Sequence, residues 1–127
     1  MIDQIIAAMK RGDRAAAWIA IEFIEEDGGF AFGSILKSNC ARELRRFPLD
    51  DEQKRRIRAR VVEMLERGFL PREFQQYEKL LRRVGVAEVR ARIEACLAHE
   101  SPWARWRAAR LLGDFATARP RSSVSGK

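Results

Sequence analysis

The chain has 127 residues, of which 46% are hydrophobic and 34% charged, and its formal net charge is +7 at pH 7. This length suits one domain with a buried core, and the composition excludes an intrinsically disordered chain. The longest apolar runs are too short for a membrane-spanning helix, and the first residues lack the basic and apolar regions of a signal peptide.

Residues that begin and end helices recur along the chain, whereas no stretch alternates with the period of two that a strand would show. We expect a first helix over residues 2–10 and a second over residues 14–27, which Asp13 caps. The second segment is apolar on almost every side, as is typical of a central helix. Its acidic end, residues 25–27, opposes the helix dipole, so we expect a basic group to compensate it there and consider a functional acidic cluster the weaker alternative.

Glycine and proline divide the middle of the chain into four further segments with helical periodicity. The breaks fall at residues 28–29, at Pro48, at Gly68 and at Gly85. The expected helices cover residues 32–46, 52–67, 72–83 and 86–98, and Leu97 is expected on the buried stripe of the last.

A seventh helix is predicted from Ser101, a good N-cap, with Pro102 in its first position and Gly113 at its end. One stripe of this helix is apolar and is expected in the core: Ala104, Ala108, Leu111, Leu112 and Phe115. The other flank mixes aromatic and cationic side chains and is the candidate partner-binding face: Trp103, Trp106, Arg107 and Arg110. The alternative is that both tryptophans pack under a neighbouring helix.

Seven short helices joined by short connections predict an all-α fold of antiparallel neighbours, with residues 1–117 as a single domain and residues 118–127 as a disordered basic tail. The segment P-W-A-R-W-R-A-A-R-L-L-G-D-F resembles the second helix of a repeat in the HEAT-like and armadillo-like α-helical repeat proteins. This resemblance implies a short α-solenoid that holds a partner on one surface. A closed helical bundle is the alternative that helix lengths alone leave open.

Side chains that carry enzyme chemistry are scarce in this sequence. His99 is the single histidine, and Cys40 and Cys96 stand far apart, so neither metal-ligand spacing nor a nucleophile with a nearby base is present. The glycine-rich residues 28–33 lack the lysine and hydroxyl residue of a phosphate-binding loop. We therefore expect a non-enzymatic protein with no cofactor, with both cysteines reduced and buried in a cytoplasmic protein.

The basic character is unevenly distributed, because residues 1–49 are neutral and the whole excess lies after them. The favoured function is a protein-interaction module whose aromatic and arginine face binds an acidic or amphipathic partner, with no membrane partner. Homodimerisation through an uncovered terminal helix is a further expectation.

Nucleic-acid binding through the basic second half is the alternative function. The side chains expected to contact phosphates are Arg55, Arg58, Arg105, Arg119 and Arg121. Against it, the cation-rich segment 54–60 is also explained as a solvated helix face with internal pairs between Glu52 and Arg56 and between Glu63 and Arg67.

Overall fold

The computed structural model describes residues 2–26, 33–71 and 73–120. These residues form seven α-helices and contain no β-strand, which confirms the predicted all-α class for the part of the chain that is described. The helices are α1 (Ile2–Lys10), α2 (Arg14–Glu25), α3 (Gly33–Arg46), α4 (Asp51–Arg67), α5 (Phe74–Val84), α6 (Arg90–Ala95) and α7 (Pro102–Leu111). Two short 3-10 turns, η1 (Ala87–Val89) and η2 (Cys96–Ala98), flank α6.

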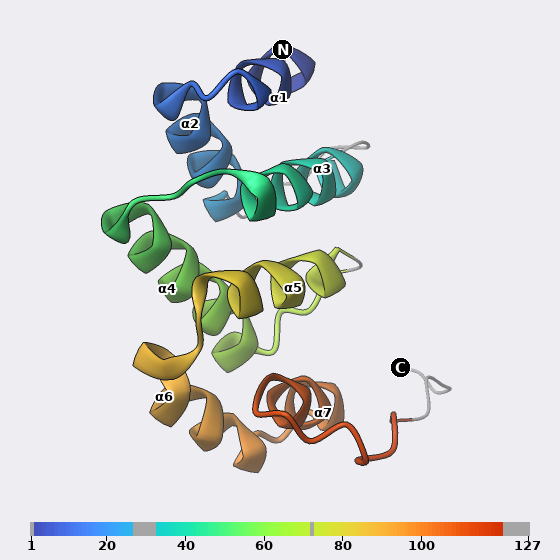
Figure 1. Cartoon of the computed structure of the whole chain (residues 1–127). Helices are drawn as coiled ribbons and strands as arrows, with labels where there is room; N and C mark the ends of the chain where they lie inside the picture. The colour runs from blue at the N-terminus through green and yellow to red at the C-terminus, as the bar shows by residue number, and fades with distance from the viewer. Residues whose placement is uncertain (1, 27–32, 72, 121–127) are drawn as a thin grey trace.

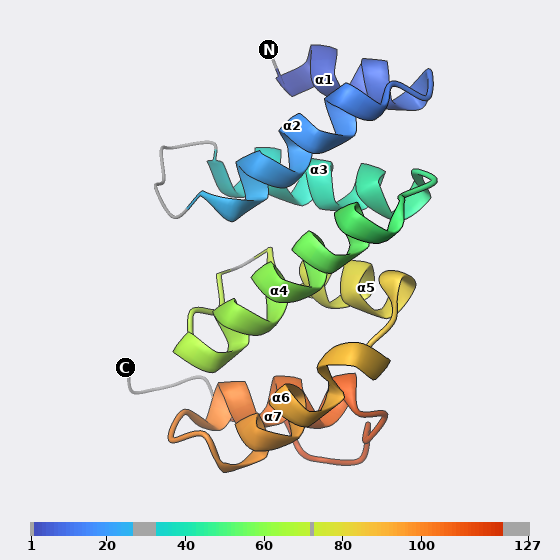
Figure 2. The same ribbon diagram turned by 90° about the vertical axis from the view of Figure 1, so that its left-hand side faces the viewer.

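The helices alternate between two sides of the molecule. Helices α2, α4 and α6 follow one another along one side, and α1, α3, α5 and α7 follow one another along the other (Figure 1). The turned view shows the same alternation, with α1 and α7 at opposite ends (Figure 2). Helix α3 packs against both α1 and α5, and α4 packs against both α2 and α6. Every helix between the two ends is therefore covered from more than one side.

One continuous hydrophobic core contains side chains from all seven helices. Its largest fully buried side chains include Tyr77 and Phe74 of α5, Ile21 and Ile24 of α2, and Leu44 of α3. The prediction of a central second helix is confirmed, because α2 packs against α1, α3 and α4. Cys40 and Cys96 are both buried and unpaired, as predicted.

Local signals set most helix ends where the sequence predicts them. The Asp13 carboxylate accepts hydrogen bonds from the backbone N–H groups of residues 15 and 16 at the start of α2. Asp50 and Gln53 form a reciprocal capping box at the start of α4. Gly68 ends α4 with φ +70°, a left-handed conformation that favours glycine.

The prediction is wrong at two exposed apolar residues. Leu97 was expected in the core, but α6 gives way to the η2 turn at Cys96 and Leu97 is 45% exposed. Phe115 was expected on the core stripe of the seventh helix, but α7 ends at Leu111 and Phe115 is 59% exposed. In both places the chain leaves α-helical geometry, so the spacing of 3.6 residues no longer decides which way a side chain points.

Candidate interaction site on helix α7

Helix α7 presents one face to the core and an aromatic pair to the other side. The Ser101 hydroxyl caps its first turn, and Ala104 and Ala108 are fully buried. Trp103 and Trp106 are half-buried and pack edge to face, with ring centroids 5.7 Å apart. The tryptophans thus belong neither to the interior nor to a fully open surface.

A buried carboxylate joins α7 to α5. The side chain of Glu78, on α5, is only 3% exposed and lies within ion-pair distance of three guanidinium groups. The N···O distances are 2.7 Å to Arg82, 2.9 Å to Arg107 and 3.3 Å to Arg110. Glu78 therefore fixes both arginines that the sequence assigns to the candidate face, and it balances only part of their charge.

The same arginines stack on aromatic rings. The guanidinium carbons of Arg107 and Arg110 each lie 4.9 Å from the centroid of the Trp106 ring. Arg110 and Arg82 also lie 5.1 Å and 5.0 Å from the centroid of Phe115. Such cation–π contacts hold planar guanidinium groups in fixed orientations.

The segment that follows α7 folds back over the tryptophan pair. The indole N–H of Trp106 donates to the backbone carbonyl of Thr117 over 3.3 Å. The Arg119 guanidinium lies 5.2 Å from the Trp103 centroid and 5.8 Å from the Trp106 centroid. Residues 121–127 lie outside the described residues, so the predicted disorder of the tail stays a prediction, and so does a role for Arg121.

An open groove of about 560 Å³ runs beside this cluster, between α7 and the connection from α4 to α5. Within the part of the chain that the structure describes, the charged side chains in its wall are arginines. The lining residues are Gly68, Leu70, Pro71, Gln75, Ser101, Trp103, Arg107 and Arg119.

Comparisons of the chain with protein-family models, with curated proteins and with solved structures find no match. The resemblance to HEAT-like repeats therefore stays a prediction. The geometry of this chain is the sole basis on which a function can be proposed for it.

The two arginines of α4 that the sequence names as candidates make different contacts. Arg55 pairs with Glu52 one helical turn away, and both side chains are exposed. Arg58 is 13% exposed and donates to the backbone carbonyls of Val84 and Gly85 over 3.1 Å and 3.2 Å. Arg58 thus caps the C-terminal end of α5. The partners of Arg55 and of Arg58 do not belong to the cluster around Glu78 on α7.

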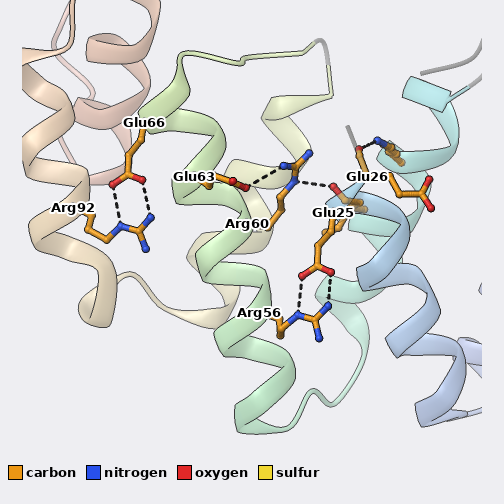
Figure 3. Close-up of polar contacts among 9 residues, drawn as sticks. Glu25, Glu26, Arg56, Arg60, Glu63, Glu66 and Arg92 are labelled. Atoms are coloured by element: carbon orange, nitrogen blue, oxygen red, sulfur yellow. Dashed lines mark hydrogen bonds and ion pairs between the residues drawn. The ribbon is translucent and has the colours of Figure 1, made fainter. Parts of the chain in front are cut away.

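A second polar surface runs across α2, α4 and α6 (Figure 3). Arg56 forms a two-pronged pair with Glu25, and Arg60 donates to the backbone carbonyl of Ile24 over 2.9 Å. The expected compensation of the acidic end of the second helix is therefore confirmed for Glu25, whereas Asp27 lies outside the described residues. The expected pair between Glu52 and Arg56 is replaced by this longer-range contact.

Two contacts of this site were not predicted from the sequence: the buried ion pairs of Glu78, and the contact of Arg119 with the tryptophans, since Arg119 was expected only as a phosphate-binding residue. Glu78 occupies the apolar stripe formed by Phe74, Tyr77 and Leu81, and a carboxylate on such a stripe indicates a buried ion pair. The role of Arg119 on the tryptophans had no comparable indication, because its contacts depend on how the chain turns after Gly113.

The described residues contain no group of three or more histidine, cysteine or acidic side chains that could hold a metal ion. Both ring nitrogens of His99 are engaged, since Nδ1 accepts from the Ser101 N–H and Nε2 donates to the Glu66 carbonyl, each over 2.9 Å. Burial raises the pKa of the Cys40 thiol to about 11, which keeps it protonated and unreactive at neutral pH. Within the same residues no helix is both long and apolar enough to cross a membrane.

Proposed function

We propose that this chain is a non-enzymatic helical interaction module that binds an acidic or amphipathic segment of a protein partner on α7. The wider architecture that we propose is a short HEAT-like array of helical pairs. It is supported by the two alternating rows of helices, in which α3 packs between α1 and α5 and α4 between α2 and α6. A closed bundle is the competing architecture.

The observation that carries the proposal is the imbalance of charge around α7. Four guanidinium groups, those of Arg82, Arg107, Arg110 and Arg119, gather around two tryptophans and Phe115, whereas one carboxylate, Glu78, is buried among them. A surplus of positive charge attracts acidic segments and speeds their association. Tryptophan and arginine are also the residues that contribute most to binding at protein interfaces.

The arginines of α7 are held ready for such a partner. The guanidinium groups of Arg107 and Arg110 each lie over the Trp106 ring and direct an N–H group to Glu78, while their side chains stay 17% and 30% exposed. A guanidinium has five N–H donors, so donors are left for a carboxylate of the partner. Fixing these side chains before binding reduces the entropy lost in the complex.

Affinity capture from native lysate, with and without nuclease, tests the proposal. The variant Arg107→Gln/Arg110→Gln removes both charges but keeps a donor toward Glu78, and Arg42→Gln/Arg90→Gln is the control that removes two charges elsewhere. We expect the α7 variant to capture about tenfold less of an acidic partner protein than the wild type. The control variant should capture the same amount as the wild type, and nuclease should have no effect.

Two outcomes of the capture experiment would contradict the proposal. If capture depends on nuclease-sensitive material and falls instead with Arg55→Gln/Arg58→Gln, the proposal is wrong and nucleic-acid binding is supported. If both variants of the main experiment retain the partner equally, α7 is not the binding face. Thermal unfolding of each variant, followed by circular dichroism, checks that the fold is intact.

A further inference from the structure

We propose that Arg119 is a binding residue of this site and forms, together with Arg107, a two-arginine clamp for the carboxylates of an acidic peptide segment. The clamp faces the groove between α7 and the connection from α4 to α5. This inference rests on the proposed function, and it adds the ligand chemistry and a residue from outside α7. It also changes the role of the tryptophans, which become the support of Arg119.

The first arm of the clamp, Arg107, is fixed from three directions. Its guanidinium carbon lies 5.5 Å from the Phe74 centroid and 4.9 Å from the Trp106 centroid. One terminal nitrogen donates to Glu78 over 2.9 Å, and the side chain is 17% exposed. Arg107 therefore brings its charge to the groove wall at a defined place.

The second arm, Arg119, reaches the groove because residues 114–120 are tied to α7. The Asp114 carboxylate accepts from the backbone N–H of Ala116 over 3.0 Å and from the Thr117 hydroxyl over 2.8 Å. The carbonyl of Thr117 in turn accepts from the indole of Trp106. The bond from Trp106 holds this segment against α7, and the exposed Arg119 lies close to both indole rings and lines the groove.

The wall of the groove suits an acidic peptide segment. Among the described residues, the charged side chains of the wall are Arg107 and Arg119, which favours an anion, and planar guanidinium groups bind carboxylates through paired hydrogen bonds. Leu70, Pro71 and Trp103 form an apolar wall beside them, suited to a hydrophobic side chain next to an acidic residue. Gln75 and Ser101 add hydrogen-bonding groups for a peptide backbone.

The test uses the full chain and a fluorescein-labelled Glu-Glu-Leu-Glu-Glu peptide, with binding followed by fluorescence anisotropy at low and high salt. We expect Arg119→Ala to weaken binding about tenfold, as for the loss of one charge-assisted interaction, and to reduce the salt dependence. Arg119→Lys should retain an intermediate affinity, because it keeps the charge without the planar fork. The matched control is Arg105→Ala, since this exposed α7 arginine bonds to the carbonyls of His99 and Glu100 and lies outside the groove wall.

Each other outcome overturns the inference. Tighter binding by Arg119→Ala would mean that residues 114–120 obstruct the groove, and unchanged binding would mean that Arg119 takes no part. Displacement of the peptide by an equal concentration of a single-stranded oligonucleotide would assign the site to nucleic acid. If the peptide fails to bind while lysate capture still requires Arg107 and Arg110, the clamp is wrong and the proposed function stands. If capture also fails, both are wrong.

Discussion

Two regions of this molecule use arginine in different ways. Between α5 and α7, one buried carboxylate, Glu78, meets three guanidinium groups. Across α2, α4 and α6, Glu25 pairs with Arg56 and Glu66 pairs with Arg92, and these two carboxylates lie nearer to water, with side chains 27% and 39% exposed. The first region keeps a surplus of positive charge, whereas the second is close to neutral.

The difference shows why arginine content alone does not locate a binding face. Helix α4 contains more cationic side chains than α7, but Arg56 and Arg58 hold neighbouring helices through Glu25 and through the end of α5. Helix α7 has fewer arginines, but two of them share the single buried carboxylate of Glu78 with Arg82. The number of partners within reach, which depends on the fold, decides which cations stay available.

The largest expected effect comes from removing the buried carboxylate. Glu78→Ala should lower the free energy of unfolding by about 2–4 kcal/mol, because it leaves three close guanidinium groups without their shared partner. Urea denaturation followed by far-UV circular dichroism measures the loss. Glu78→Gln should cost less, since the amide oxygen still accepts a hydrogen bond from one arginine.

The matched control for this comparison is Glu25→Ala in the neutral region. Glu25 pairs with one arginine and is 27% exposed, so its loss should cost about 0.5–1 kcal/mol. Equal losses for the two variants would show that the depth of Glu78 and its three partners add nothing to stability.

A smaller effect is expected at the glycine that forms one edge of the α7 groove. Gly68 has φ +70°, and a Cβ atom there would lie 3.1 Å from Cε1 of His99. Gly12 has a similar φ of +86° but open space around it. Gly68→Ala should therefore cost about 1–2 kcal/mol for the left-handed backbone and the contact together.

The control variant Gly12→Ala isolates the backbone contribution, so it should cost less than Gly68→Ala in the same urea experiment. Shifting His99 would also disturb its hydrogen bonds to Ser101 and to the Glu66 carbonyl, next to the groove. Equal costs would show that the His99 ring moves aside freely and that the groove edge is not rigid.

The sequence predicts the starts of α2, α4 and α7 well, because the residues that determine them are neighbours in the chain, whereas the helix expected over residues 86–98 is α-helical only over Arg90–Ala95. Asp13, Gln53 and Ser101 each act within three residues of their partners. The position of α2 against three other helices also follows from local composition, since the helix is apolar on almost every side, although its Ile19 is 40% exposed. Errors arise at Leu97 and Phe115, where the chain leaves the α-helix and its periodicity stops applying.

Only part of the candidate site can be predicted from the sequence. Trp103, Trp106, Arg107 and Arg110 were found because they share one flank of one helix. Their partner Glu78 lies 29 residues before Arg107, and no local spacing pairs them. The same limit explains why Arg56 was assigned to Glu52 instead of Glu25, which lies 31 residues away and meets it through the packing of α2 on α4.

The smallest change in stability is expected for the exposed pair of Glu66 and Arg92, and this change depends on pH. Hydrogen bonding to Arg92 lowers the pKa of Glu66 below its ordinary value. A carboxyl group with a lowered pKa in the folded state stabilises the fold above its unfolded pKa of about 4.3, and this contribution is lost as the pH falls through the folded value. Since Glu66 is 39% exposed, we expect about 0.5 kcal/mol at pH 7.

Glu66→Gln should therefore be less stable than the wild type at neutral pH and equal to it in acid, once the wild-type carboxyl group is protonated. Urea titrations across this range measure the difference between the two curves. Arg92→Gln should remove the same difference, and adding Glu66→Gln to it should change little, because the pair contributes only when both charges are present. If the difference in stability between wild type and Glu66→Gln stayed the same in acid, Glu66 would contribute through packing and not through its charge. The pairs across α2, α4 and α6 would then differ from the Glu78 cluster only in how deeply their carboxylates are buried.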